Sequence, residues 1–346
     1  MRHFCTYFDH NYLLRGLTLY ASLARHAGPF VLWVLCLDDA TYAALSKLDL
    51  PDVRAISLPT FERDDNTLMA AKRDRSPVEY YFTCTPSWLS YLLEQSPPID
   101  MVTYLDADLF FYSSPEPIYE EMGNGSVLIV GHRFPEKLRS WERYGIYNVG
   151  YLTFRNDSYG RQCLHWWRDR CLEWCYDRVE DNRFADQKYL DDWPTRFPQL
   201  VVLRHKGAGL APWNVENYSL TLRNGRVLVD SEPLVFFHFH NFQQVGRRLY
   251  DPGLARYRAQ ASRVLKRQIY SPYVRGLSAA GRSLRGLTDH SQVRLASIRQ
   301  KYQAIDLAGS HGSAPDGLVK DLRERYVLAK KVYHGDLWLS IHGWLL

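Results

Sequence analysis

Two carboxylates separated by one residue stand at the end of an apolar run. Asp106 and Asp108 follow residues 101–105, which read as a short buried strand, and residues 109–111 continue in the same style. Burying ionised carboxylates is costly unless a cation or hydrogen-bond donors compensate. Residues two apart project to the same side of an extended chain, so this pair can share one divalent ion that suits the two phosphates of a nucleotide-sugar. A pair of solvated loop acids is the alternative interpretation.

A second set of metal-ligating side chains lies far downstream, where His238 and His240 alternate with phenylalanines. On a strand both histidines face the same way, so either one can join the carboxylates. An imidazole together with carboxylate and diphosphate oxygens suits Mn²⁺, with Mg²⁺ as the alternative ion. Two partly buried histidines bonded to the backbone would produce the same pattern.

Two shorter clusters also carry polar groups that could serve a site. Asn148 stands at the start of a strand, and Gly150 stands where a ligand or a backbone must approach closely. Asp186 and Gln187 open the segment 186–190. An ordinary turn would explain the first cluster and helix capping the second, so neither indicates a function by itself.

Strands and helices alternate along the first quarter of the chain, and this rhythm favours an α/β layer with a mostly parallel sheet and right-handed crossovers. A helix over residues 80–93 leads into the strand that ends near Asp106. The other helices are expected over residues 12–25, 40–48 and 160–179. The strands are expected over residues 4–8, 31–37, 53–56, 101–105, 126–130, 147–154, 200–203 and 234–239.

The composition is that of a globular protein, because 46% of the 346 residues are hydrophobic and 23% are charged. The longest apolar run, residues 30–37, is far too short to span a bilayer, and we expect no signal peptide, because the N-terminal residues lead straight into the first expected strand. The six cysteines form no Cys-x-x-Cys pair and are interpreted as packing thiols. These features predict a reduced, cytoplasmic protein.

The pattern becomes helical and basic near residue 250, where we place a boundary between a main domain, residues 1–250, and an extension, residues 251–346. The extension contains 16 Lys and Arg but only 7 Asp and Glu. Basic residues interleaved with tyrosine and tryptophan suit an anionic headgroup layer, so we expect a peripheral contact with the inner face of the cytoplasmic membrane. A solvated helical face is the alternative, and we expect no nucleic-acid partner.

Taken in order, these motifs resemble glycosyltransferase family 8, the nucleotide-sugar glycosyltransferases of the GT-A fold that include glycogenin and bacterial lipopolysaccharide galactosyltransferases. The resemblance covers about residues 1–245 and not the extension. The matching segments are residues 6–12, 17–23, 104–108, 147–150, 186–187, 212–214 and 237–239.

The resemblance implies a role for each matching residue. The base and ribose would be held by Thr6, Tyr7, Asp9 and Tyr12. The metal would be held by Asp106, Asp108 and His238, with Asp106 also near the ribose. The sugar or acceptor would be bordered by Asn148 and Gly150, and the anomeric carbon would lie by Asp186 and Gln187. The Lys-Pro-Trp that usually follows the metal histidine in the family is absent here. Arg247 is therefore our candidate for neutralising the diphosphate.

The implied reaction is metal-dependent transfer of a hexose from a nucleoside diphosphate sugar, expected to be a UDP-sugar, to an acceptor hydroxyl. The expected acceptor is a carbohydrate or lipid-linked glycan of an envelope polysaccharide or glycolipid. In the retaining case, Asp186 and Gln187 would stabilise an oxocarbenium-like centre and position the acceptor. If the enzyme instead inverts, Asp186 would act as the general base.

Two other functions are compatible with parts of this pattern. A nucleotidyltransferase that makes the activated sugar shares the α/β layer and the metal carboxylates, but it normally has a Gly-rich phosphate loop after the first strand. The sequence has residues 9–12, Asp-His-Asn-Tyr, at that place. A non-catalytic glycan-binding protein would use the abundant aromatics and would bind sugar without Asp106.

Overall fold

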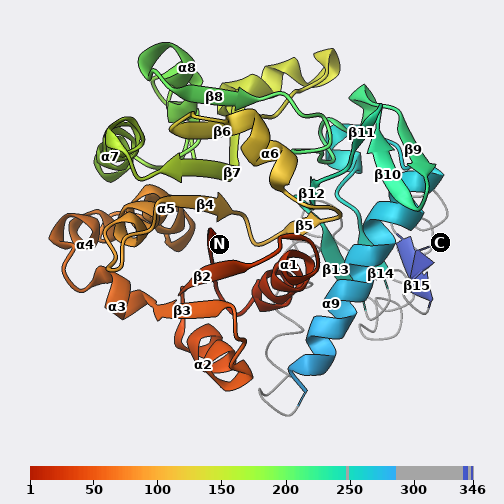
Figure 1. Ribbon diagram of the computed structural model, residues 1–346, viewed down its shortest axis with the longest axis horizontal. Coiled ribbons are helices and arrows are strands. Elements are labelled where there is room, and N and C mark those ends of the chain that lie inside the picture. Colours follow the sequence, from red (N-terminus) through yellow and green to blue (C-terminus); the bar gives the residue numbers. More distant parts are fainter. Residues whose placement is uncertain (247–248, 286–337, 342–343, 346) are drawn as a thin grey trace, which may run out of the picture. The chain divides into compact units, whose positions relative to one another are not determined.

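A seven-stranded sheet is the largest sheet of the computed structural model, which describes residues 1–246, 249–285, 338–341 and 344–345 (Figure 1). The strands are β1 (Arg2–Phe8), β2 (Phe30–Cys36), β3 (Val53–Ser57), β4 (Met101–Leu105), β6 (Val127–Gly131), β7 (Tyr147–Arg155) and β8 (Leu200–Leu203). Their order is β3-β2-β1-β4-β7-β6-β8. β7 runs antiparallel to both of its neighbours, and the other neighbouring pairs are parallel. The expected α/β fold with a mostly parallel sheet is confirmed.

The backbone divides into two units, Met1–His238 and Phe239–Leu346, and the seven-stranded sheet lies entirely in the first. No helix in the described part of the chain combines the length and the apolar character needed to cross a bilayer. Arg247, the residue predicted to face the diphosphate, lies outside the described residues.

Several helices of the first unit begin at an N-cap residue whose side chain accepts a hydrogen bond from the first turn. Asp38 accepts a hydrogen bond from the backbone N–H of Thr41 at the start of α2, and Ser76 forms a capping box with Glu79 at the start of α5. These bonds satisfy amides that every helix leaves unpaired at its N-terminus. The α-helices of the first unit are α1 (Leu13–His26), α2 (Asp39–Leu48), α3 (Leu58–Glu62), α4 (Asn66–Lys72), α5 (Pro77–Leu93), α6 (Glu116–Met122), α7 (Ser158–Glu173) and α8 (Trp193–Arg196).

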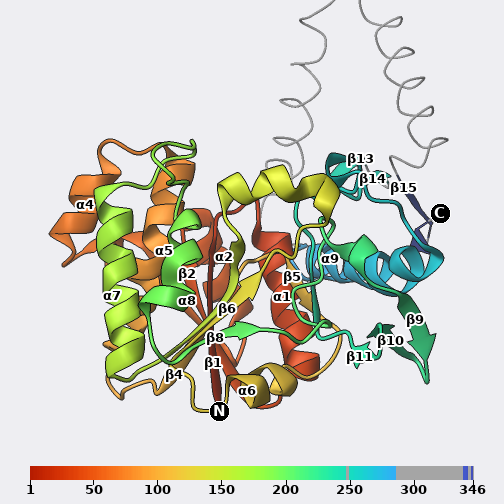
Figure 2. The same cartoon turned by 90° about the horizontal axis from the view of Figure 1, so that it is seen from above.

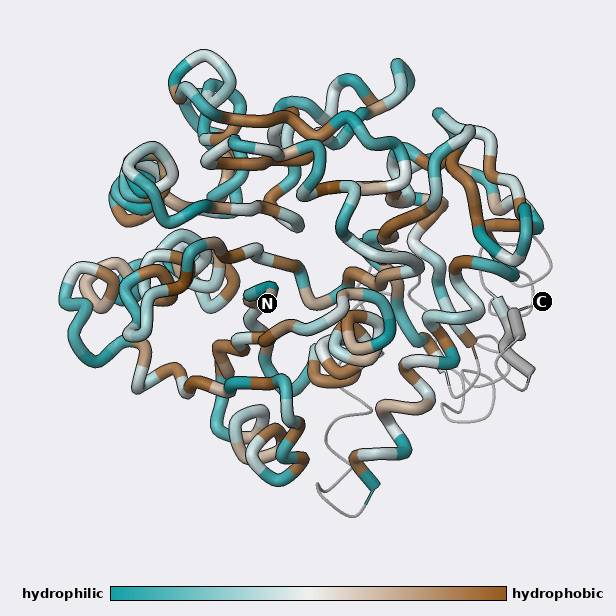
Figure 3. The backbone as a smooth tube through the Cα atoms, viewed as in Figure 1, coloured by the Kyte–Doolittle hydropathy of each residue, from teal (hydrophilic) through white to brown (hydrophobic). Residues whose placement is uncertain are grey.

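The helices lie on both faces of the sheet. Helices α4, α5 and α7 gather on one face, while α1 and α6 lie on the other (Figures 1 and 2). Hydrophobic residues follow the strands between them (Figure 3). Under α5 and α7 the core is rich in indole rings, because Trp88, Trp167 and Trp193 are fully buried there and the last two rings meet edge to face at 5.4 Å. This aromatic packing holds the helices against the strands that carry the site.

A pair of short strands joins distant parts of the first unit. β5 (Leu109–Phe111) follows the Asp106–Asp108 segment and pairs antiparallel with β12 (Phe236–His238), which places His238 opposite Leu109. A separate three-stranded sheet contains β9 (Leu220–Arg223), β10 (Arg226–Val229) and β11 (Glu232–Pro233).

The second unit has its own small sheet and helix. The strands β13 (Gln243–Gly246), β14 (Leu249–Asp251), β15 (Trp338–Ile341) and β16 (Trp344–Leu345) pair in that order, and a π-helical turn, Leu265–Tyr270, runs into α9 (Ser271–Ser283). We expected a helical extension, and its described part also contains strands. β15 pairs with β14 although 86 residues separate the two strands in the sequence, and sequence periodicity does not reveal so non-local a contact.

Candidate functional site

The candidate site lies where strands β1 and β4 reach their carboxyl ends. β4 ends at Leu105, directly before Asp106, and the parallel strand β1 ends at Phe8, directly before Asp9. In open α/β sheets, ligands bind in the crevice outside the carboxyl ends of the strands. The fold therefore brings both N-terminal motifs to the edge where a ligand is expected.

Asp106, Asp108 and His238 form a close group at this edge. One ligand atom from each side chain lies within 4.8 Å of the other two. The Nε2 atom of His238 is 3.0 Å from Asp108 Oδ1 and 3.6 Å from Asp106 Oδ2. His240 belongs to the second unit, where its ring meets Tyr257 with centroids 6.2 Å apart. Of the two candidate histidines, the geometry thus brings His238 to the carboxylates.

Burial and mutual charge shift the pKa values of Asp106 and His238 in this group. The side chains of His238 and Asp108 are only 4% and 13% accessible. Desolvation raises the pKa of Asp106, the His238 charge opposes that rise, and the Asp108 carboxylate adds to it. For His238, burial opposes the charged form, but the two carboxylates prevail and raise its pKa. Two carboxylate oxygens and one imidazole nitrogen form a donor set that suits Mn²⁺, so the residues present fit a divalent cation.

Gly150 provides the space beside this group. A Cβ atom at this position would lie 2.6 Å from Asn148 Oδ1, 2.8 Å from Asp106 Oδ2 and 2.9 Å from His238 Cε1. The Gly150 carbonyl accepts a hydrogen bond from the Asp106 amide at 2.9 Å, and the Gly150 amide donates to Asn148 Oδ1 at 2.9 Å. Because glycine has no side chain, its backbone can lie directly against Asp106, Asn148 and His238.

We expect Gly150→Ala to weaken Mn²⁺ binding by about tenfold or more, because overpacking typically costs 1–3 kcal/mol and the added methyl would displace the metal-facing side chains. Titration of free Mn²⁺ by electron paramagnetic resonance measures this affinity directly. Gly131→Ala is the matched control, since its added methyl would meet only Arg133, at 3.7 Å and beyond. Equal Mn²⁺ affinities in both variants would contradict the assignment.

Asn148 links Gly150 to Gln187. Its Nδ2 atom lies 3.4 Å from Gln187 Oε1 and 3.2 Å from His132 Nε2, while Gln187 Nε2 donates to the Tyr144 carbonyl at 3.0 Å. The structure thus brings both shorter motifs to one place. His132 is buried and was not singled out in the sequence, where a histidine after an apolar strand carries no distinctive spacing.

Asp186 is buried and lies close enough to Asp106 for the two charges to interact. Desolvation raises its pKa to about 7, the Thr85 hydroxyl bond opposes that rise, and the charge of Asp106 adds to it. Trp167 Nε1 donates to the Asp186 carbonyl at 2.8 Å and so anchors this residue to the aromatic core. The preceding residue, Ala185, has a φ of 46°, a strained conformation for a residue with a Cβ atom. Strain of this kind concentrates at functional sites.

The residues expected to hold the nucleoside, which lie on β1 and just after it, take up different positions. Thr6 is fully buried, and Tyr7 places its hydroxyl 3.1 Å from Thr85 Oγ1. Tyr12 is 43% accessible, yet desolvation of its hydroxyl and the carboxylates of Asp108 and Asp106 raise its pKa, whereas Arg15 opposes the rise. Tyr12 is therefore open to solvent and also lies close enough to Asp106 and Asp108 to feel their charges.

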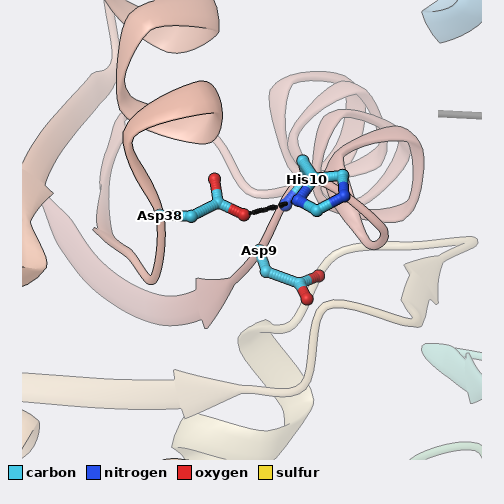
Figure 4. A group of neighbouring side chains, drawn as sticks. All are labelled: Asp9, His10 and Asp38. Atoms are coloured by element: carbon cyan, nitrogen blue, oxygen red, sulfur yellow. Dashed lines mark hydrogen bonds and ion pairs between the residues drawn. The ribbon is translucent and has the colours of Figure 1, made fainter. Parts of the chain in front are cut away.

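Asp9 belongs to a second group of candidate ligands with His10 and Asp38 (Figure 4). Asp38 Oδ2 accepts from His10 Nδ1 at 2.6 Å, and its other oxygen caps α2. Asp9 accepts from the amides of Asn11 and Tyr12, at 3.0 and 3.2 Å. Because these carboxylates already stabilise their own loop, the group of Asp106, Asp108 and His238 is the better candidate for holding a metal ion.

Together the fold and the site define a mixed α/β protein with an Asp-x-Asp pair and a distant histidine at the carboxyl edge of its sheet. The chain belongs to the same family as two uncharacterized proteins of Bacillus subtilis (strain 168), YfnF and YfnD. It is 32% identical to YfnF over 250 residues, which is 70% of this chain and 82% of YfnF. It is 30% identical to YfnD over 278 residues, which is 80% of this chain and 88% of YfnD. No protein-family model matches the chain.

The solved structures that this chain is similar to include glycosyltransferases. The galactosyltransferase LgtC, in complex with donor and acceptor sugar analogs, has a TM-score of 0.49 and 16% identity, covering 76% of this chain and 98% of LgtC. Mouse xyloside xylosyltransferase 1 has a TM-score of 0.45 and 14% identity, covering 69% of this chain and 98% of its own.

Proposed function

We propose that this protein is a glycosyltransferase that moves a hexose from a nucleoside diphosphate sugar, a UDP-sugar, to an acceptor hydroxyl. The observation that carries this proposal is the convergence of Asp106 and Asp108 with His238, beside Gly150 and at the carboxyl end of β1. The same edge holds Asp186 and Gln187, whose functional groups suit the sugar end of such a donor.

The diphosphate of the donor would lie beside the group of Asp106, Asp108 and His238. Asp106, Asp108 and His238 would hold Mn²⁺ or Mg²⁺ through two oxygens and one nitrogen. The charge that develops on the departing diphosphate would be neutralised by the bound cation. Arg247 stays a prediction for the same role, because it lies outside the described residues.

The nucleoside and the sugar of the donor would lie on either side of the diphosphate and contact different residues. Tyr12 is the accessible aromatic beside the metal group and would contact the nucleoside, with Thr6, Tyr7 and Asp9 shaping the strand end beneath it. Asn148 and Gly150 would border the sugar. Gln187 would position the acceptor, since its amide is already held by Tyr144 and Asn148.

Asp186 is the proposed catalytic group on the sugar side. In a retaining reaction its carboxylate would stabilise positive charge at the anomeric carbon, and in an inverting reaction it would accept the proton of the acceptor hydroxyl. Both roles need the ionised form. With a pKa of about 7, Asp186 changes charge within the neutral range, as general-base catalysis favours.

A panel of nucleotide-sugars with Mn²⁺, scored for release of the nucleoside diphosphate, tests the proposal. We expect one donor to be consumed, with turnover lost in excess EDTA, and NMR of the anomeric product to give the stereochemical outcome. No turnover of any donor, or full activity in EDTA, would refute the proposal. Formation of a nucleotide-sugar from UTP and a sugar phosphate would indicate the nucleotidyltransferase alternative.

The proposed acceptor is a glycan attached to an envelope polysaccharide or a lipid, met at the inner face of the cytoplasmic membrane. The excess of basic residues in the extension supports this proposal. We expect the full-length protein to sediment with vesicles rich in phosphatidylglycerol at low salt and to dissociate as salt rises. Equal sedimentation with neutral vesicles would contradict the proposed contact.

A further inference from the structure

Three aromatic residues gather beside Gln187, the residue proposed to position the acceptor. Trp141 and Tyr144 belong to the 3₁₀-helical segment Glu136–Tyr144, and Phe184 precedes Gln187 in the chain. The rings of Tyr144 and Phe184 meet edge to face with centroids 4.8 Å apart, and the ring of Trp141 meets that of Tyr144 in the same way at 5.9 Å. All three residues are half-buried, and we call them the aromatic cluster.

Hydrogen bonds fix the 3₁₀-helical segment against the segment that carries Gln187. Gln187 Nε2 donates to the Tyr144 carbonyl at 3.0 Å, and Lys188 Nζ donates to the Glu142 carbonyl at 2.8 Å. The 3₁₀ segment ends at Gly145, whose φ of 132° favours glycine, and a Cβ atom there would lie 3.1 Å from Gln187 Cγ. The backbone that carries two of the three rings is therefore held directly against Gln187.

Further contacts place Gln187 near the metal group. Gln187 Oε1 lies 3.4 Å from Asn148 Nδ2, and Asn148 Oδ1 accepts from the Gly150 amide at 2.9 Å. The Gly150 carbonyl accepts from the amide of Asp106, also at 2.9 Å. Gln187 itself directly follows Asp186, the proposed catalytic group. A molecule that rests on the aromatic cluster therefore has one end at the sugar side of the proposed site.

The surroundings of the aromatic cluster differ from those of rings that only fill a core. The cluster is not part of the core that the described residues form under α5 and α7. Polar groups border it instead, because the Arg143 guanidinium lies 4.6 Å from the centroid of the Tyr144 ring and the Gln187 amide is held by the Tyr144 backbone. A pyranose ring has C–H faces that pack on aromatic rings and hydroxyls at its edge that bond to polar groups. Half-buried rings with such a border suit a sugar ring.

We infer that the aromatic cluster is the acceptor subsite and that it holds a pyranose ring of the acceptor glycan. The inference rests on the proposed function and adds to it the surface that the acceptor contacts. The rings would pack on the C–H face of the pyranose, while Gln187 would direct one of its hydroxyls toward the anomeric carbon of the donor. An acyclic polyol has the hydroxyls but no such face, so it should be a poor acceptor.

Trp141→Ala and Tyr144→Ala test the inference on transfer, with methyl pyranosides and sorbitol as acceptors. We expect the wild type to prefer a pyranoside, and KM for that acceptor to rise about tenfold or more in each variant, while KM for the donor stays within about threefold. Tyr144→Phe keeps the ring and should keep most of the acceptor affinity. Tyr159→Ala is the matched control, because Tyr159 is an exposed tyrosine of α7. Equal acceptor KM values in the three alanine variants, or sorbitol used as well as the pyranosides, would overturn the inference.

Saturation-transfer difference NMR with the same methyl pyranosides tests the subsite without any turnover. Irradiation of the aromatic protons of the protein should saturate the C–H protons of a bound pyranoside. We expect this signal in the wild type and in Tyr159→Ala, and we expect its loss in Trp141→Ala. If the protein consumed a nucleotide-sugar but gave no signal with any pyranoside, the inference would fail and the proposed function would stand. A signal that depends on Trp141, in a protein that consumes no nucleotide-sugar, would refute the proposed function and leave a pyranose-binding site established.

Discussion

Replacing Asp106 or Asp108 by asparagine is expected to lower kcat/KM for the nucleotide-sugar by about 10³-fold or more. Each change removes one charged oxygen donor from a group whose ligand atoms lie within 4.8 Å of one another. A bound cation contributes several kcal/mol to the stabilisation of developing charge, and each 1.36 kcal/mol is tenfold in rate. Mn²⁺ affinity, measured by electron paramagnetic resonance, should fall in parallel with activity.

Asp64→Asn is the matched control, because Asp64 is an exposed carboxylate of the first unit outside both groups of candidate ligands. It should change neither activity nor Mn²⁺ affinity. If Asp106→Asn kept full metal-dependent turnover, the metal assignment would be wrong. Circular dichroism spectra that match the wild type would show that a loss reflects the site and not the fold.

Replacing Asp186 by asparagine is expected to abolish transfer and, at pH 8, to stabilise the protein. The pKa of Asp186 is about 7 when folded, against an ordinary value of 3.8. Between these values the folded protein holds a proton that the unfolded chain has released, so wild-type stability falls as pH rises through this range. Asparagine carries no charge and escapes this loss. Its advantage should grow by about 1.4 kcal/mol for each pH unit between 4 and 7, and level off above 7.

Urea unfolding of the wild type and Asp186→Asn at pH 5 and pH 8 measures this difference. We expect the stabilisation to be about 2–3 kcal/mol larger at pH 8 than at pH 5. Asp64→Asn should show no such dependence on pH. A stabilisation that is the same at both pH values would mean that Asp186 is not a desolvated carboxyl group, and its proposed catalytic role would lose its physical basis.

The buried position of Asp186 lowers the stability of the fold in exchange for its proposed catalytic role. The fold buries the Asp186 carboxylate without an ion-pair partner among the described residues, and it holds the preceding Ala185 at a positive φ. Trp167 supports the segment from the core through a hydrogen bond to the Asp186 backbone. Such costs persist at sites where the chemistry requires them.

Most of the elements could be predicted from local patterns. Apolar runs such as residues 31–37 become the buried strand β2, because a strand covered on both faces needs a continuous hydrophobic sequence. The helix expected over residues 80–93 is α5, which begins three residues earlier, at Pro77, because Ser76 and Glu79 form a capping box there. The strands of the C-terminal extension were missed, because β14 and β15 pair across a long interval of sequence and neither strand shows a strong alternation.

By itself the sequence determined the chemistry available to this protein: two carboxylates separated by one residue, two histidines that alternate with phenylalanines, and the Asp186–Gln187 pair. Only the tertiary structure decided which of these groups meet. Pairing of β12 with β5 brings His238 to Asp108, and the Asn148 side chain brings Gln187 beside Gly150. The physical reason is that side-chain type is a local property, whereas distance between side chains depends on strand register and helix packing across the whole fold.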